Sequence, residues 1–389
     1  MPVSRALVAF SIFMAINLAI PASSSFKGGQ ARASLNQDAI QKALRQAQSK
    51  LVADSATTAP VVFIGSSLII APLWSTDVKH GYFYQDCMLH HQSKSFEELL
   101  KNEGKPAPVV SLATAGQFVS DTYLIVDKFI AAAKNKPRAL IYGIAPRDFM
   151  DDTTGGLALT SVFDELVEVS DLPRFGDLFF STFDEQGDFL LNRSVYLYRK
   201  RGRYQGKFND AMTKVVARLY RDKSTIASAA SGNLGGTNND PLAGFLLGGN
   251  RSDIWSKSID EYSRRYKVFN KQQFAKQKEC FKALVALCKE KNIKLYVVAM
   301  PLTADNRKLM PRELYQSYID CVSSTTREAA VPFLDLEAKG DYKDADFYDT
   351  VHLNGIGGEH FLSAMADFVR DPEDASRAVA AKKASSPTY

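Results

Sequence analysis

The sequence has few cysteines and histidines and carries only a small net charge. Four cysteines in 389 residues exclude a fold held by a dense disulfide framework, and no Cys/His spacing resembles a metal site. The net charge is +5 with basic and acidic residues mostly interleaved, which argues against nucleic acid as a partner. With 46% apolar residues, the chain is predicted to be globular, with a sizeable core. Because no metal-site spacing is present, no metal or other cofactor is predicted.

Long hydrophobic runs are also scarce, and the main one lies at the N-terminus. After Arg5, residues 6–25 carry no charge and end in Pro-Ala-Ser-Ser-Ser. Residues 1–25 are therefore predicted to be a secretory signal peptide. The alternative is an uncleaved N-terminal anchor, because the run is close to the roughly 20 residues that a membrane span needs. Both interpretations predict export to the periplasm, the cell envelope or the extracellular space.

Short apolar runs alternate with helical patterns through most of the chain. Five runs lack polar alternation, which is typical of strands in a parallel sheet covered on both faces: 61–65, 108–113, 138–144, 294–300 and 331–336. Helical patterns cover 35–53, 120–136, 272–292 and 311–330. This alternation predicts an α/β fold, a layered sandwich around a central parallel sheet of about five strands.

Residues 150–270 interrupt this alternation. They contain a stretch rich in Gly, Asn and Ser at 227–253, which is too long for a simple connection. We interpret 150–270 as an insertion of helices plus a flexible loop within a domain spanning 35–370. The loop would serve as a lid, a partner surface or filler, and 371–389 is predicted to be a flexible tail.

The first predicted strand ends in a glycine and two serines. Ligands of open parallel sheets bind at the carboxyl ends of the strands, where Gly65, Ser66 and Ser67 are expected. A hydroxyl there either caps the following helix or acts as a nucleophile assisted by the helix dipole.

An acid and a base occur together near the C-terminus. Asp349 and His352 are three residues apart and are followed by Leu-Asn-Gly. A nucleophilic serine needs an imidazole to take its proton and a carboxylate to orient that imidazole. The alternative is a capping Asp beside a surface His. Among the other histidines, His360 is the weaker candidate base, and the segment with His80, His90 and His91 is expected on the surface or in a substrate cleft.

Two sequence blocks resemble the SGNH, or GDSL-type, hydrolase superfamily: Gly65-Ser66-Ser67-Leu68 and Asp349-Thr350-Val351-His352. The resemblance covers roughly 60–145 and 290–368. It implies a flavodoxin-like sheet with Ser67 as the nucleophile, His352 as the base and Asp349 as its orienting acid. The Gly-Ser-Ser variant, the export signal and the insertion resemble a branch of exported proteins, which includes the D-alanyl transfer protein of teichoic acid and alginate-type O-acetylation proteins.

The middle blocks of the family fit less well. Gly116 stands where the family has a glycine whose backbone N–H helps to form the oxyanion hole, and it also suits a turn with positive φ. The family's Asn donor falls on Ala145, so no side-chain donor is present there. Arg147 is predicted to bind an oxyanion or a substrate anion, with Asp148 orienting it; the alternative is a surface ion pair.

These features support a hypothesis and two alternatives. The first is an exported serine-dependent acyl-ester hydrolase or O-acyltransferase that acts on a carbohydrate of the cell envelope or the extracellular space. The second is a catalytically weak or inactive scaffold that partners a membrane O-acyltransferase in polysaccharide modification or export. The third is a phosphate- or sulfate-ester enzyme that uses Arg147.

Overall fold

The computed structural model describes residues 33–55, 58–82, 87–151, 156–194, 252–267 and 269–373. The predicted signal peptide or anchor lies outside the described residues, as does nearly all of the predicted tail. None of the described helices is both long enough and apolar enough to cross a membrane.

The centre of the fold is a parallel sheet of five strands. In chain order the strands are β1 (Val61–Gly65), β2 (Val109–Ser111), β3 (Ala139–Ile144), β4 (Leu295–Ala299) and β5 (Phe333–Asp335). The spatial order is β2-β1-β3-β4-β5 and every pairing is parallel. This is the flavodoxin-like order. β2 is added on one side of β1, and β3, β4 and β5 are added in turn on the other side. The predicted fold class and all five predicted strands are confirmed.

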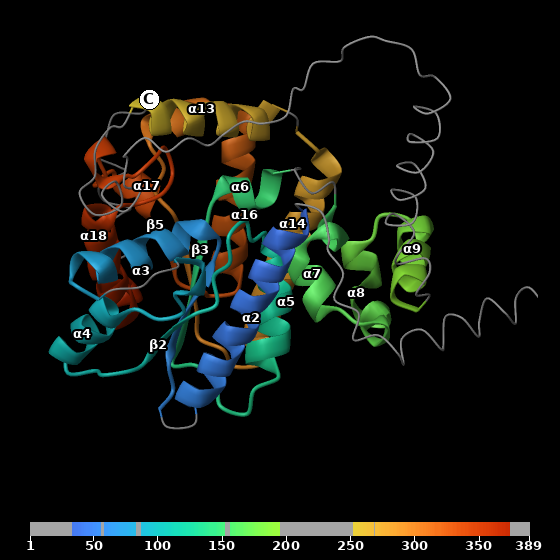
Figure 1. Cartoon of the computed structure of the whole chain (residues 1–389), viewed down its shortest axis with the longest axis horizontal. Coiled ribbons are helices and arrows are strands. Elements are labelled where there is room, and N and C mark those ends of the chain that lie inside the picture. Colours follow the sequence, from blue (N-terminus) through green and yellow to red (C-terminus); the bar gives the residue numbers. More distant parts are fainter. Residues whose placement is uncertain are drawn as a thin grey trace, which may run out of the picture. The chain divides into compact units, whose positions relative to one another are not determined.

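A layer of helices covers each face of the sheet (Figure 1), and aromatic side chains pack between the sheet and each layer. On one face, Phe63 of β1 packs against Phe96 of α4 (Lys94–Asn102) at 5.1 Å and Phe361 of α18 (Gly355–Arg370) at 6.3 Å between ring centroids. On the opposite face, Tyr142 of β3 lies 6.4 Å from Phe281 of α14 (Lys271–Glu290). Helix α3 (Ser67–Lys79) packs with α4 and α18, whereas α5 (Val119–Ile125) and α16 (Arg312–Glu328) pack with α14.

The remaining helices that belong with the sheet are shorter or lie at the edges of these layers. They are α2 (Ala33–Ser55), η1 (Cys87–Leu89), the π-helix η2 (Val126–Ala131), α6 (Pro146–Met150), η3 (Leu157–Leu159), α7 (Ser161–Leu166), α13 (Ser252–Lys267), α15 (Ala304–Lys308), α17 (Leu336–Lys339) and η5 (Asp344–Asp346). Helices α2, α14 and α16 occupy the predicted positions within two residues.

The helix predicted over 120–136 is shorter than expected. It begins as α5, continues as η2 and ends at Ala131. The Lys136 ammonium group donates hydrogen bonds to the carbonyls of Ile130, Ala131 and Ala133 at 3.1, 2.7 and 2.7 Å. Lysine near the C-terminus thus satisfies the last carbonyls from outside the helix instead of extending it.

The contacts divide the chain into two units, one of which includes residues 168–238. Its described part contains η4 (Val169–Asp171), α8 (Leu172–Phe179) and α9 (Phe183–Ser194). Phe175 and Phe179 pack at 5.9 Å within α8, and Phe180 and Phe189 pack at 5.5 Å. The described parts of the predicted insertion are mainly helical. Of the predicted loop at 227–253, all but the last two residues lie outside the described residues, and those two begin α13.

Candidate active site

The end of β1 places Ser67 at the carboxyl edge of the sheet. A Cβ on Gly65 would lie 2.5 Å from the carbonyl oxygen of Gly143 on the neighbouring strand, and Gly65 has φ +147°, so only glycine fits. Ser66 occupies the N-cap of α3, yet its side chain makes no capping hydrogen bond. Ser66 is buried and Ser67 is half-buried, so Ser67 is the more accessible of the two hydroxyls.

Asp349 holds a tight turn that contains His352. Its Oδ1 accepts hydrogen bonds from the backbone N–H of Val351 at 2.9 Å and of His352 at 2.8 Å, while Oδ2 lies 2.7 Å from His352 Nδ1. The turn is closed by Tyr348 N–H, which donates to the His352 carbonyl at 2.8 Å. Asn354 caps α18 through its Oδ1, which explains the Leu-Asn-Gly that follows the histidine.

The turn and the first strand meet, although they lie 285 residues apart in the chain. His352 Nε2 is 2.8 Å from Ser67 Oγ. An ionised Asp349 has only acceptors, so Nδ1 of His352 carries the proton toward it. Nε2 of the neutral ring then accepts from the Ser67 hydroxyl, which is the arrangement that activates a serine for attack. The three predicted side chains therefore lie in one connected line.

The electrostatics of the turn stabilise an ion pair. Burial would raise the pKa of Asp349, but the charge and hydrogen bonds of His352 and the backbone hydrogen bonds hold it below its ordinary value. Burial would lower the pKa of His352, but the charge and hydrogen bond of Asp349 raise it above 6.5. The imidazolium that forms when His352 takes a proton is thus stabilised where it forms.

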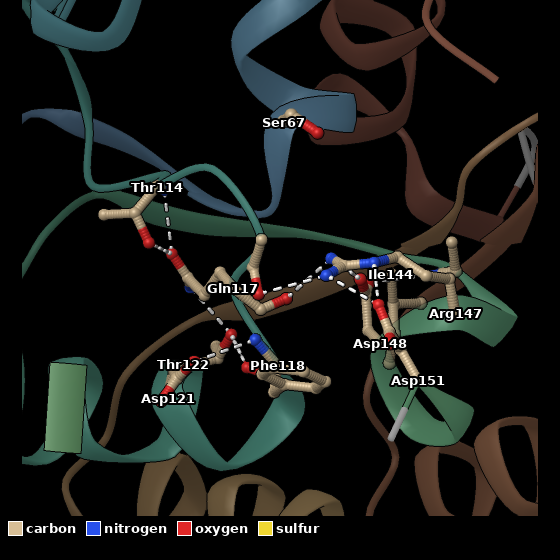
Figure 2. A network of polar contacts seen from close by, with 12 residues as sticks. Ser67, Thr114, Gln117, Phe118, Asp121, Thr122, Ile144, Arg147, Asp148 and Asp151 are labelled. Atoms are coloured by element: carbon tan, nitrogen blue, oxygen red, sulfur yellow. Dashed lines mark hydrogen bonds and ion pairs between the residues drawn. The ribbon is translucent and has the colours of Figure 1, made fainter. Parts of the chain in front are cut away.

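The loop after β2 brings Gly116 to the same edge. Thr114 N–H donates to the Gly65 carbonyl at 3.2 Å, which ties this loop to the end of β1. Gln117 Oε1 accepts from the backbone N–H of Thr114 at 2.9 Å and from its hydroxyl at 3.0 Å (Figure 2). Gly116 has φ +74°, so the predicted positive φ is confirmed.

Arg147 of α6 is buried, and its guanidinium group is directed at this loop (Figure 2). Nη2 donates to the Gly116 carbonyl at 3.2 Å and Nη1 to the Gln117 carbonyl at 3.5 Å. Nη1 also lies 3.3 Å from Asp148 Oδ1, and Nε donates to Asp151 Oδ2 at 3.3 Å. All three nitrogens thus bond inside the protein, and the ion pair with Asp148 is buried instead of lying on the surface. The contact of Arg147 with an oxyanion or a substrate anion stays a prediction. Asp148 does contact Arg147, as the sequence suggested.

Asp151 links this network to the inserted segment. Its carboxylate also forms an ion pair with Arg265 of α13, and its carbonyl accepts from Gln273 Nε2 at 2.8 Å. Sequence reasoning missed Asp151 and Arg265 because neither belongs to a recognisable motif, and Arg265 lies 114 residues further along the chain.

The other histidines lie away from the Ser67–His352 pair. His90 and His91 are buried, contrary to the expected surface or cleft position: His90 Nε2 is 3.1 Å from Asp77 Oδ2, and His91 Nδ1 is 3.1 Å from the Ser111 carbonyl. His80 is exposed and pairs with Glu359, while His360 lies within α18. Within the described residues, no group of His, Cys, Asp and Glu is suited to hold a metal ion.

Comparison with known proteins gives distant structural likenesses. No family model and no curated protein sequence matches the chain. It is similar to Axe2, an acetylxylan esterase from Geobacillus stearothermophilus, at 13% identity and a TM-score of 0.34, over 81% of this chain and 94% of that one. It is also similar to LAE5, an alpha/beta hydrolase enzyme from the metagenome of Lake Arreo, Spain, at 12% identity and a TM-score of 0.33, over 82% of this chain and 96% of that one. The site assignment therefore rests on the geometry given above.

Proposed function

We propose that this protein is a serine-dependent acyl-ester hydrolase or O-acyltransferase of the SGNH type. The observation that carries the proposal is the hydrogen-bonded line from Ser67 Oγ through His352 to Asp349, at 2.8 and 2.7 Å. Each distance is within the range at which a base activates a nucleophile.

The proposed reaction has two halves. Ser67 Oγ attacks the acyl carbonyl while His352 Nε2 takes the hydroxyl proton, and Asp349 stabilises the imidazolium. The tetrahedral intermediate collapses to an acyl-serine, and His352 returns the proton to the leaving alcohol. A water molecule or an acceptor hydroxyl then attacks the acyl-serine by the same route. Hydrolysis and transfer differ only in that acceptor.

The oxyanion would be held by backbone groups. The N–H of Ser67 stands at the N-terminus of α3, where the helix dipole favours negative charge. The N–H of Gly116 is the second proposed donor. Ala145 is buried at the family's Asn position and offers no side-chain donor, so the oxyanion hole would have one donor fewer than the family pattern. We assign Arg147 to positioning the Gly116 loop.

The proposed cellular setting rests on the sequence alone. The apolar segment at 6–25 supports export to the periplasm, the cell envelope or the outside, with or without a retained anchor. The resemblance to exported O-acetylation and D-alanyl transfer proteins supports a carbohydrate of the envelope or the extracellular space as the substrate. A membrane O-acyltransferase would then be the expected partner.

Replacement of Ser67 tests the proposal. The full chain and its Ser67→Ala variant are assayed with acetyl and aryl esters, and both are treated with an organophosphonate that labels activated serines. We expect turnover and labelling by the parent and loss of both in the variant, by a factor on the order of 10⁴ or more in rate. Equal turnover by the two proteins would refute the proposal.

The absent Asn donor supports the scaffold alternative, in which the same fold presents a polymer or a partner to a membrane acyltransferase. Removal of a single oxyanion donor costs about 3 kcal/mol of transition-state stabilisation, which would leave a weak enzyme. If the phosphonate fails to label Ser67 in the folded parent protein, the scaffold is favoured.

A further inference from the structure

Helix α13 lies across the edge of the sheet where the strands end (Figure 1). Four of its side chains contact this edge at spacings that follow one helical face. Trp255 Nε1 donates to Asp305 at 3.2 Å, and Tyr266 donates to Asn306 at 3.5 Å, both on α15. Ser258 contacts Thr350, and Arg265 contacts Asp151. The helix belongs to the segment that matched no family block, yet it reaches both sides of the candidate site.

Thr350 is the residue directly after Asp349, and it is completely buried. Its hydroxyl lies 2.6 Å from the Ser258 hydroxyl, and its N–H donates to Ser258 Oγ at 3.3 Å. Its carbonyl accepts from the Thr303 hydroxyl at 2.9 Å, and its Oγ1 accepts from Asn306 Nδ2 at 3.1 Å. Each polar atom of Thr350 is therefore held by α13 or by the start of α15.

We propose that Ser258 is a positioning residue: it holds Thr350, and thereby fixes the Asp349–His352 turn against Ser67. Through this contact, helix α13 of the inserted segment becomes a structural part of the proposed active site. This inference rests on the proposed function, in which His352 acts as the base.

The contacts of Ser258 distinguish it from the other residues of α13 as the one that holds the Asp349–His352 turn. It is the only residue of α13 among the described contacts that bonds to the turn between the acid and the base, and it does so twice. A turn that shifts by a fraction of an ångström lengthens the bond from His352 Nε2 to Ser67 Oγ, and misplacement by about 1 Å costs on the order of 10²-fold in rate.

The first test follows the His352 ring by NMR titration, without substrate. The chain has five histidines, so its imidazole signals are few. The charged groups that act on His352 are Asp349 in the same turn, Arg147 on α6 and Glu261 on α13. Ser258→Ala leaves all three in place but loosens the turn, so the pKa of His352 should fall relative to the parent protein. Ser256→Ala, on the exposed side of the same helix, should leave it unchanged.

The second test measures ester turnover. Ser258→Ala should lower kcat about tenfold with KM within about twofold, because the loss is one of alignment in the transition state. Thr350→Ser retains the hydroxyl and should stay close to the parent. If Ser258→Ala fails to fold, Ser258→Cys replaces it, since a thiol of similar size is a weak hydrogen-bond donor.

The outcomes separate the two proposals. An unchanged His352 titration and unchanged kcat in folded Ser258→Ala, with Ser67→Ala inactive, would overturn this inference and leave the proposed function standing. Turnover that persists in Ser67→Ala would refute the proposed function, and the His352 titration would still decide whether Ser258 holds the turn.

Discussion

At the scale of single residues, the two adjacent serines differ in environment rather than in chemistry. Ser66 is buried and makes no capping hydrogen bond, whereas Ser67 begins α3 and its Oγ lies 2.8 Å from His352 Nε2. Arg147 shows the same dependence on environment. A guanidinium after a strand suits anion binding, but here Gly116, Gln117 and two carboxylates take up its donors. Its effect on the chemistry is therefore expected to pass through the Gly116 loop.

Gly116→Ala tests that loop. A non-glycine residue at φ +74° costs about 1–2 kcal/mol of folding stability, whereas the added Cβ would lie 3.6 Å from Arg147 Nη2, an ordinary contact. We expect this stability loss together with a kcat/KM lowered about tenfold or more, because relaxation of the strain turns the Gly116 N–H away from the oxyanion.

Gly104→Ala is the matched control. Gly104 has φ +72° with nothing within 4 Å of an added Cβ, and it follows α4 away from the site. Thermal unfolding should show a similar stability loss with kcat/KM unchanged. Equal activity of the two variants would remove Gly116 from the proposed oxyanion hole.

At the scale of elements, α3 and α18 pack against each other and bring Ser67 and the His352 turn together. Helix α3 begins with Ser67, and α18 follows the His352 turn directly through its Asn354 cap. The two helices pack through a glycine: a Cβ on Gly358 would lie 2.2 Å from Thr76 Oγ1 and 2.8 Å from the Pro72 carbonyl. We therefore expect a change in this helix packing to change the Ser67–His352 bond.

Gly358→Ala should push α3 and α18 apart. We expect a loss of about 1–3 kcal/mol in the free energy of unfolding, as for other overpacked cores, and a lower kcat because Ser67 moves away from His352. Chemical denaturation and ester turnover measure the two effects.

Gly187→Ala on α9 is the control, because there is open space around the new methyl group. Its free energy of unfolding should rise by about 0.5–1 kcal/mol through helix propensity, with unchanged turnover. A stable, fully active Gly358→Ala would contradict the coupling.

At the scale of the whole molecule, the buried carboxyl groups change the folding stability with pH in opposite directions. Burial raises the pKa of Asp121 and of Asp148 to about 6, against the pull of Arg147 on both. Asp349 moves in the opposite direction because its partners outweigh burial. A carboxyl group with a raised folded-state pKa adds stability below the unfolded-state pKa of 3.8, and this contribution is lost as pH rises through about 6. Asp349 adds stability that is lost as pH falls.

Asp121→Asn isolates one of these groups. The difference in unfolding free energy, parent minus variant, should fall by about 2 kcal/mol between pH 4 and pH 7, from a pKa raised by about two units. Denaturant titrations at several pH values measure it. Asp320→Asn, at an exposed position on α16, serves as the control and should follow the parent. A constant difference for Asp121→Asn would show that this carboxyl stays ionised in the fold.

The sequence by itself determined the sheet and the three residues of the proposed mechanism. Apolar runs without alternation mark buried parallel strands, and the carboxyl ends of such strands meet at one edge, which places a hydroxyl after the first strand near a late Asp-x-x-His. Those signals are local in the chain or follow from topology. Only the tertiary structure decided that α13 contacts the turn at Thr350, that Asp151 joins Arg147 to Arg265, and that Arg147 bonds to backbone carbonyls. These contacts join segments up to 114 residues apart through single polar side chains, and one hydroxyl or carboxylate leaves no periodic or spaced pattern in the chain.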